Sequence, residues 1–339
     1  MATDFDRNEF LANLETAVRE KGRYADLAAR IAREKGINRL YLIGCGAPNR
    51  QMGAVKYLVE SVARKLEVHL YFPAEFVEQN PPKIDEHTLV ILGSHSGTTP
   101  EVVRAAKFLQ GKPCTVMGIT QKADSPLAQN VEYPVLYGES KSGYFAMYIL
   151  LQALVGAVLK EIEGWADHDE VMASLDAFPA ALADAIEQSE ARVTEEARLY
   201  KDDKLFFVIG SGPCFSTAYV YGVCILTEMQ WLTGIPVEAA EWFHGPFELF
   251  DEKLPAIIVL GEDASRPLAE RVVRFCKRYS ERLMIYDSKD FEMKGVAPVA
   301  RPLFAPFILS AALDRQAEHL AVWHNHPLST RRYMWKTEY

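Results

Sequence analysis

The sequence predicts an α/β protein made of two tandem copies of one unit, each a parallel β-sheet flanked by helices. Short apolar segments that end in glycine alternate with helical segments, the pattern typical of parallel strands joined by crossover helices. Landmarks of the first half recur in the second half at a nearly constant offset. Hydrophobic residues make up 49% and charged residues 24% of the 339-residue chain, as in globular proteins of about two domains.

The first half begins with helical segments and continues with strands. Amphipathic patterns predict helices over residues 6–20 and 23–35, the second closed by Gly36. A further helix is expected at 51–65, and an apolar segment at 144–159 predicts a buried helix, because it is shorter than the ~20 residues that span a bilayer. Buried strands are expected at four places: 40–44, 68–72, 88–93 and 114–119.

The second half repeats these landmarks. Gly210 lies 166 positions after Gly44, and residues 240–242 follow residues 74–76 by the same number. Two further apolar segments lie 168 positions after their counterparts, at 259–261 and 283–286. We therefore expect N-terminal helices (1–35), a first domain (36–163), a helical linker (164–200), a second domain (201–325) and a C-terminal tail (326–339).

Composition excludes several classes of protein. Lys and Arg total 37 against 46 Asp and Glu, and the net charge of −9 argues against nucleic acid or an anionic membrane as the main partner. The polar start at residues 1–7 lacks the apolar stretch of a signal peptide, so we expect a cytoplasmic protein. Five scattered cysteines form no C-x-x-C pair and indicate reduced, buried thiols.

A loop rich in hydroxyl groups follows the third strand. Ser94, Ser96, Thr98 and Thr99 precede a helix that begins at Pro100. Backbone N–H groups at a helix N-terminus, with hydroxyls beside them, suit a phosphate group. An ordinary N-cap would need only one hydroxyl, so the loop favours phosphate binding.

The second copy carries two carboxylates, Glu262 and Asp263, where the first copy has its hydroxyl loop. Two negative charges there would repel a phosphate. We therefore expect that the second copy has lost this role.

The second copy offers instead a carboxylate and an imidazole. Residues 218–232 read as a helix, and Glu228 lies on an otherwise apolar stripe formed by Tyr221, Cys224, Ile225, Trp231 and Leu232. Such a carboxylate could act as a general base or acid, or it could point to water near the helix end; the spacing leaves both open. His244 stands in an aromatic-rich turn, where catalytic and packed structural roles are both compatible with the sequence.

No cofactor or metal is expected. His324 and His326 lack a third ligand at useful spacing and fit a surface tail. The glycines after the two first strands, Gly44–Gly46 and Gly210–Gly212, do not complete the dinucleotide fingerprint. We therefore exclude a nicotinamide cofactor.

The hydroxyl loop Ser94-x-Ser96-Gly97-x-Thr99-x-Glu101 and the duplicated unit resemble the sugar isomerase (SIS) domain family. This resemblance implies three-layer α/β/α units of the flavodoxin type. Glu228 and His244, sixteen apart, resemble the pair in the isomerase half of glucosamine-6-phosphate synthase, and we expect no counterpart of that enzyme's glutaminase domain. The segments 228–231, 241–248 and 326–339 are similar to fructosamine-6-phosphate deglycases, especially those acting on 6-phosphofructose-aspartate.

The resemblance implies a site and a reaction. Glu228 and His244 would be catalytic, Ser94, Ser96 and Thr99 would bind the phosphate with His95 beside them, and Gly46 would line the sugar. Further candidates are Glu241, Arg331, Arg332 and Lys336. Lys336 matches the synthase's Schiff-base lysine only loosely. The two arginines either pair with the carboxylates of an acidic conjugate or hold the tail onto the protein. The histidine would come from the neighbouring subunit of a homodimer. The implied enzyme cleaves a 6-phosphofructosyl amino acid without a cofactor; the alternatives are an aldose–ketose phosphosugar isomerase and a non-catalytic phosphosugar sensor.

Overall fold

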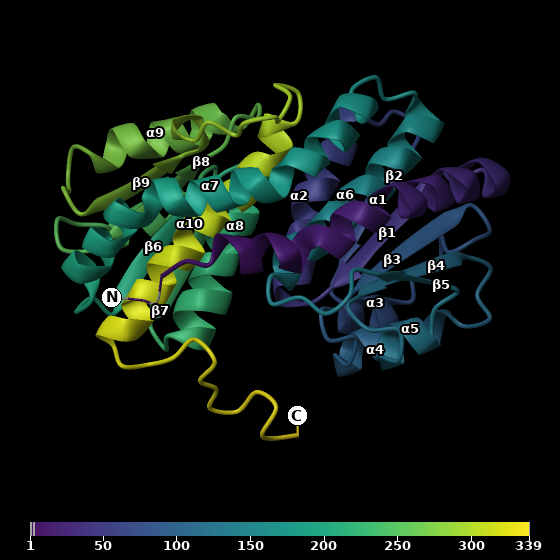
Figure 1. The fold of residues 1–339 in the computed structure, drawn as a ribbon, viewed down its shortest axis with the longest axis horizontal. Helices are drawn as coiled ribbons and strands as arrows, with labels where there is room; N and C mark the ends of the chain where they lie inside the picture. Colours follow the sequence, from purple (N-terminus) through teal and green to yellow (C-terminus); the bar gives the residue numbers. More distant parts are fainter. Residues whose placement is uncertain (1, 3, 339) are drawn as a thin grey trace. The chain divides into compact units, whose positions relative to one another are not determined.

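Two parallel β-sheets organise the computed structural model, which describes residue 2 and residues 4–338 (Figure 1). The first sheet has the strand order β2-β1-β3-β4-β5 and the second has the order β7-β6-β8-β9, with every paired strand parallel. The second order reproduces the first without its last strand. The predicted α/β class with parallel sheets flanked by helices is confirmed.

The strands of the first sheet are β1 (Arg39–Gly44), β2 (Glu67–Tyr71), β3 (Thr88–Gly93), β4 (Thr115–Thr120) and β5 (Tyr133–Leu136). Those of the second are β6 (Leu205–Gly210), β7 (Thr233–Glu238), β8 (Ala256–Leu260) and β9 (Leu283–Asp287). The sequence analysis missed β5 and β7. Both are edge strands that contain a proline, which interrupts the apolar run that marks a central strand.

The chain divides into two compact units, Asp6–Pro179 around the first sheet and the rest of the described chain around the second. The first unit contains α1 (Arg7–Lys35), α2 (Gly46–Val62), α3 (Pro73–Gln79), α4 (Pro100–Leu109), α5 (Pro126–Gln129) and α6 (Gly143–Glu163). The helix α7 (His168–Tyr200) includes Pro179, where the division falls. The second unit contains α8 (Phe215–Tyr219), α9 (Arg266–Cys276), α10 (Arg301–Trp323) and the short helices η1 (Gly212–Cys214), η2 (Val220–Met229), η3 (Pro246–Leu249) and η4 (Ser288–Asp290).

The expected apolar helix is α6, which packs against α1 and α2. Among the described residues it is the one helix long and apolar enough to cross a membrane, but 83% of its most apolar window is buried inside the protein. The helix is therefore part of the core of its unit.

The prediction of two N-terminal helices is wrong, because α1 runs without a break to the left-handed cap at Gly36. Gly22, which falls in the gap between the two expected helices, lies within α1. A glycine in a helix interior costs only about 1 kcal/mol. The buried positions Leu14, Ala17, Ala25 and Ala28 continue one apolar face across the glycine and more than offset that cost.

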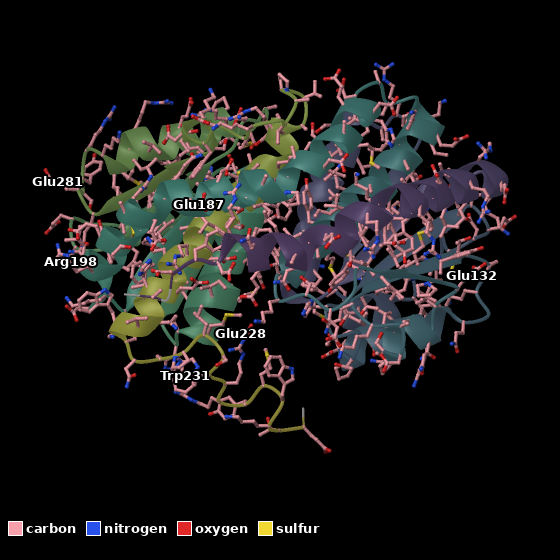
Figure 2. All side chains as sticks on the ribbon, in the orientation of Figure 1. Glu132, Glu187, Arg198, Glu228, Trp231 and Glu281 are labelled. Carbon is pink, nitrogen blue, oxygen red and sulfur yellow. The ribbon has the colours of Figure 1, made fainter. Side chains whose placement is uncertain are left out.

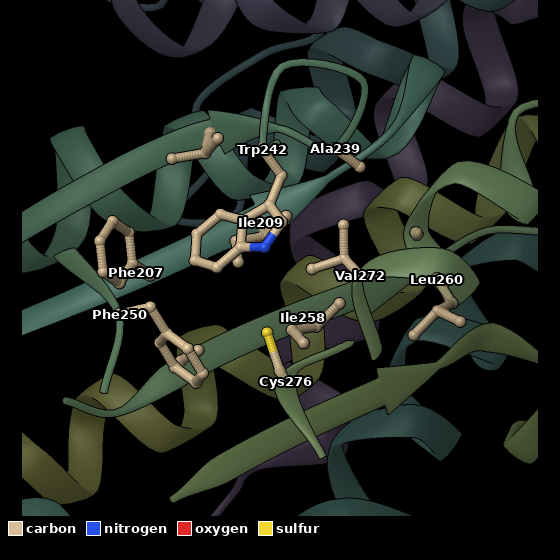
Figure 3. Packing of buried hydrophobic residues seen from close by; sticks show 12 residues of the cluster. Phe207, Ile209, Ala239, Trp242, Phe250, Ile258, Leu260, Val272 and Cys276 are labelled. Carbon is tan, nitrogen blue, oxygen red and sulfur yellow. The ribbon is translucent and has the colours of Figure 1, made fainter. Parts of the chain in front are cut away.

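Trp242 belongs to the core of the second unit. Its ring is fully buried and meets Phe207 and Phe250 edge to face, with centroids 5.1 and 5.6 Å apart (Figure 3). Phe243 and Phe247 pack against Phe275. Aromatic residues in such a turn suit a subunit interface, and the sequence predicts this role for Trp242, Phe243 and Phe247. The prediction is wrong for Trp242, because its side chain is fully buried within its own unit.

The five cysteines are all free, as expected. Cys214, Cys224 and Cys276 are buried, whereas Cys45 and Cys114 are half-buried. Burial raises the pKa of Cys276 to about 12 and that of Cys45 to about 11. These thiols are therefore protonated and unreactive near neutral pH.

Candidate functional site

The hydroxyl loop and Gly46 lie at neighbouring strand ends in the first unit. Gly44 of β1 pairs with Gly93 of β3, so the turns that follow these strands leave the same edge of the sheet. The chain then passes to β2 on one side and to β4 on the other. Such a point, where the strand order diverges at the carboxyl edge, is the usual ligand crevice of an open α/β sheet.

The hydroxyl loop is held by its own side chains. The Ser94 Oγ and Thr99 Oγ1 atoms are 2.8 Å apart, and the Gly97 N–H donates to Ser94 Oγ at 3.1 Å. The Thr98 N–H and hydroxyl both donate to Ser96 Oγ. Thr99 occupies the N-cap position of α4 without a side-chain cap bond, so the ordinary capping alternative is not realised by this residue. The first N–H groups of α4 remain suited to an external anion.

Gly97 is required by the shape of this loop. Its φ of +68° lies in the left-handed region, and a Cβ atom there would collide with Ser125 Oγ and come within 2.7 Å of Thr120 Oγ1. The carbonyl of Gly97 accepts a bond from the Leu127 N–H. The loop is thus fixed against the end of β4 and the start of α5.

His95 is tied to Tyr137 rather than being free in the loop. Its Nδ1 lies 2.6 Å from the Tyr137 hydroxyl, and the two rings stack. Gly143, the first residue of α6, leaves the space that the His95 ring occupies. Partial removal from water lowers the pKa of His95, so the neutral ring is favoured.

The matching turn of the second unit is satisfied internally. Asp263 Oδ1 accepts bonds from the backbone N–H and the hydroxyl of Ser265, at 2.8 and 2.6 Å. Glu262 is paired with Arg301 at 2.7 Å. A carboxylate therefore takes the hydrogen bonds that a phosphate would need there.

Glu228 lies near the end of η2, a π-helix, and not on the α-helix expected over residues 218–232. The backbone N–H of Gln230 donates to the Ile225 carbonyl, five residues back, and the Thr227 hydroxyl donates to Gly222 O at 2.9 Å. Of the predicted stripe, Tyr221, Cys224 and Leu232 are buried and Ile225 is half-buried, but Trp231 is exposed, because the wider turn changes the face on which residues near its end fall. π-Helical turns are rare and often mark functional sites.

Glu228 is paired with Arg331 of the C-terminal tail. Arg331 Nη2 lies 3.0 Å from Glu228 Oε1, and the guanidinium also donates to the carbonyls of Leu328 and Thr330. Burial raises the pKa of Glu228, and the charge and hydrogen bond of Arg331 act in the opposite direction. The result is a partly desolvated carboxylate with a pKa above its ordinary value, as a general base near neutral pH requires.

A cavity of about 480 Å³ opens beside this ion pair, between the end of η2 and the tail. We call it the Glu228 cavity. It is lined by Thr227, Glu228, Trp231, Leu232, Thr233, Arg331, Arg332, Tyr333 and Met334. Figure 2 labels two residues of its wall, Glu228 and Trp231. Sequence reasoning missed Trp231 as part of the site, because its contacts with the tail depend on residues far apart in the chain.

The tail is anchored by polar contacts. Gln230 Oε1 accepts a hydrogen bond from His324 Nδ1 at 2.9 Å, and the Gln230 Nε2 amide group donates to the carbonyl of His326. Lys336 donates to the backbone carbonyl of Arg331 at 2.6 Å. The two histidines therefore help to hold the tail in place rather than standing free on the surface. No group of three or more metal-ligating side chains is found within the described chain.

His244 and Glu241 are exposed in the turn after β7. The His244 N–H donates to the Glu241 carbonyl at 3.0 Å. Glu228 precedes β7 and borders a cavity that includes Thr233, the first residue of that strand, whereas His244 follows its last residue, Glu238. Within the second unit, Glu228 therefore lies at the amino-terminal end of β7 and His244 lies beyond its carboxyl end.

Known proteins resemble this chain over most of its length. Residues 35–157 match the SIS domain family. The fructosamine deglycase FrlB of Bacillus subtilis is 36% identical over 90% of this chain and 94% of its own, and the fructoselysine 6-phosphate deglycase of Escherichia coli is 24% identical over 88% and 86%. A solved phosphosugar isomerase-type protein of Bacillus subtilis superposes with a TM-score of 0.90 at 34% identity, covering 96% of this chain and all of that one.

Proposed function

The chain belongs to the SIS domain family that includes the fructosamine deglycases, and on this basis we propose that it is an enzyme that cleaves a 6-phosphorylated fructosamine. The products would be glucose 6-phosphate and a free amino acid. The observation that carries the proposal is the partly buried Glu228 carboxylate at the edge of a ligand-sized cavity, in a chain similar to FrlB along nearly its whole length.

The proposed reaction needs one base and one further proton-transfer group. His244 assists opening of the sugar ring by proton transfer at the ring oxygen. Glu228 then removes a proton from C1 of the open-chain ketose, which gives an enaminol, and returns the proton at C2. Water adds to the resulting aldimine, and the C1–N bond breaks to release the aldehyde of glucose 6-phosphate and the amine.

The phosphate is assigned to the hydroxyl loop, on Ser94, Ser96 and Thr99, with His95 beside it and Gly46 lining the sugar. The open N-terminus of α4, the placement at the point where the strand order diverges and the rigid turn at Gly97 support this assignment. The loop would contact the end of the substrate that does not react.

The active site is proposed to combine two subunits of a homodimer. Within one chain, Glu228 and His244 lie at opposite ends of strand β7, which supports a site that takes each residue from a different chain. For the conjugated amino acid we propose an acidic residue such as aspartate, in line with the similarity of the tail to enzymes of that specificity.

Assays of glucose 6-phosphate release test the proposal. Conjugates of 6-phosphofructose with aspartate, lysine and glutamine should yield glucose 6-phosphate, with the aspartate conjugate giving the highest kcat/KM, whereas fructose 6-phosphate should not be converted. Glu228→Gln and His244→Ala should each lower kcat by about 100-fold or more, the scale of an acid–base group. Glu281→Gln, an exposed carboxylate before β9, serves as the control. Isomerisation of fructose 6-phosphate alone would favour the isomerase, and binding without product would favour the sensor.

A further inference from the structure

The two adjacent arginines in the wall of the Glu228 cavity are held in different ways. The Arg331 side chain is only 8% exposed, and its guanidinium is engaged by Glu228 and by the carbonyls of Leu328 and Thr330. The positive charge of Arg331 is therefore already paired within the protein. Arg331 is available to keep Glu228 charged and in place, but not to be the main partner of a second anion.

Arg332 is exposed, and its guanidinium lies 4.2 Å from the centre of the Trp231 ring. Among the described residues no carboxylate is paired with it. A guanidinium on an indole face is oriented by the cation–π contact, while its edge N–H groups stay available to a planar anion. The cavity wall thus presents an oriented guanidinium that no carboxylate of the described chain pairs with.

The Trp231 platform is held in an unfavourable backbone conformation. Its φ is +56°, which is a genuine outlier for a bulky residue. Hydrogen bonds from Gln230 N–H to Ile225 O and from Leu232 N–H to Leu226 O fix the backbone on both sides of Trp231. The His326 ring packs edge-on against the Trp231 ring, with ring centroids 4.6 Å apart. Such strain persists where the surroundings over-determine a conformation, as at ligand clamps.

The chemistry of the substrate supplies the missing anion; this step rests on the proposed function. When an amino acid is conjugated to 6-phosphofructose through its α-amino group, the nitrogen on C1 also carries the α-carbon, and the α-carboxylate is attached to that carbon. The α-carboxylate is therefore only a few bonds from C1, so a base that removes a proton from C1 comes close to it. Two negative groups so close together repel unless a cation lies beside them.

We propose that Arg332, oriented by Trp231, binds the α-carboxylate of the substrate's amino acid. The Glu228 cavity would then be the subsite for the amino acid, and Arg332 would select amino-acid conjugates over conjugates of simple amines and over plain ketose phosphates. Because every amino acid conjugated through its α-amino group keeps its α-carboxylate at this place, the contact does not depend on the side chain of such a conjugate.

Three conjugates of 6-phosphofructose separate the alternatives. The aspartate conjugate carries both carboxylates, the alanine conjugate lacks the side-chain carboxylate, and the β-alanine conjugate lacks the α-carboxylate. Arg332→Ala should lower kcat/KM about ten- to a hundred-fold for the aspartate and alanine conjugates, the scale of a hydrogen bond to a charged group, and leave the β-alanine conjugate unchanged. Trp231→Leu should show the same pattern with a smaller loss.

Lys112→Ala is the matched control, since Lys112 lies at the same 4.2 Å from the centre of an aromatic ring, that of Phe108, in the other unit. It should affect none of the three substrates. An equal loss with all three conjugates for Arg332→Ala would reveal a structural role and overturn the inference, and so would a loss confined to the aspartate and β-alanine conjugates. If the wild type released no glucose 6-phosphate from any conjugate, the proposed function itself would fail, an outcome distinct from both.

Discussion

Glu228 and His244 are separated by the whole of strand β7. Glu228 borders the cavity at the amino-terminal end of this strand, and His244 lies in the turn beyond its carboxyl end. The strand has six residues, and at about 3.3 Å per residue it spans roughly 17 Å. A proton-transfer pair needs its groups within a few ångströms of one substrate, so this geometry has a direct consequence for the assembly.

The first prediction is that inactive variants restore activity when their subunits exchange. Glu228→Gln and His244→Ala proteins should each be nearly inactive, but a mixed dimer would hold one site with both groups intact. About half of a statistical mixture is heterodimer with one working site of two, so roughly a quarter of wild-type activity should return. A mixture that stays inactive after exchange has been verified by mass spectrometry would refute the shared site.

The second prediction concerns Arg331 as a positioning residue for Glu228. Burial raises the pKa of Glu228 and Arg331 lowers it, so loss of the arginine should raise this pKa further. A base works only when deprotonated, and kcat/KM falls as pH drops through its pKa. Arg331→Met should therefore move the acid limb of the pH profile to higher pH.

The pH profile of Arg331→Lys provides the control, because lysine keeps the positive charge. Its acid limb should lie close to that of the wild type, and activity of the methionine variant should recover partly at high pH. A uniform loss of rate with an unmoved acid limb would mean that Arg331 only supports the tail.

The third prediction tests the phosphate assignment. Ser96→Ala should raise KM about ten- to a hundred-fold with little change in kcat, because the hydroxyl is assigned to the non-reacting end of the substrate. The unphosphorylated fructosyl amino acid is the control substrate, and the variant and the wild type should process it equally poorly. An unchanged KM for the phosphorylated substrate would place the phosphate elsewhere.

The fourth prediction compares two glycines with left-handed backbones. Gly97 and Gly111 have φ values of +68° and +80°, but a Cβ at Gly97 would strike Ser125, whereas a Cβ at Gly111 would meet open space within the described part of the chain. Both alanine variants should lose about 1–2 kcal/mol of unfolding free energy from the backbone conformation alone. Gly97→Ala should lose more and should also raise KM.

Urea unfolding and steady-state kinetics of the two variants check this comparison. Equal losses of stability with unchanged KM values would show that the turn at Gly97 can relax, and the rigid-loop argument would then fail.

The sequence alone determined the two sheets and the hydroxyl loop. Central parallel strands such as β1, β3 and β6 are buried on both faces, so they appear as continuous apolar runs that end in glycine. Because both halves contain such apolar runs, their segments can be matched at a nearly constant offset in sequence. The hydroxyl loop is contiguous in sequence, and its position directly after β3 fixes its place at the carboxyl edge.

Only the tertiary structure decided the surroundings of Glu228. The π-helix depends on the close approach of Gly222 and Gly234 and on the Thr227 hydroxyl, which donates to Gly222 O and accepts from Gly234 N–H. An α-helical period cannot reveal such a change of register. The pairing of Glu228 with Arg331, the stacking of Arg332 on Trp231 and the burial of Trp242 likewise join residues distant in sequence. Local patterns record how a segment meets solvent or core, whereas the identity of a long-range partner depends on how the whole chain packs.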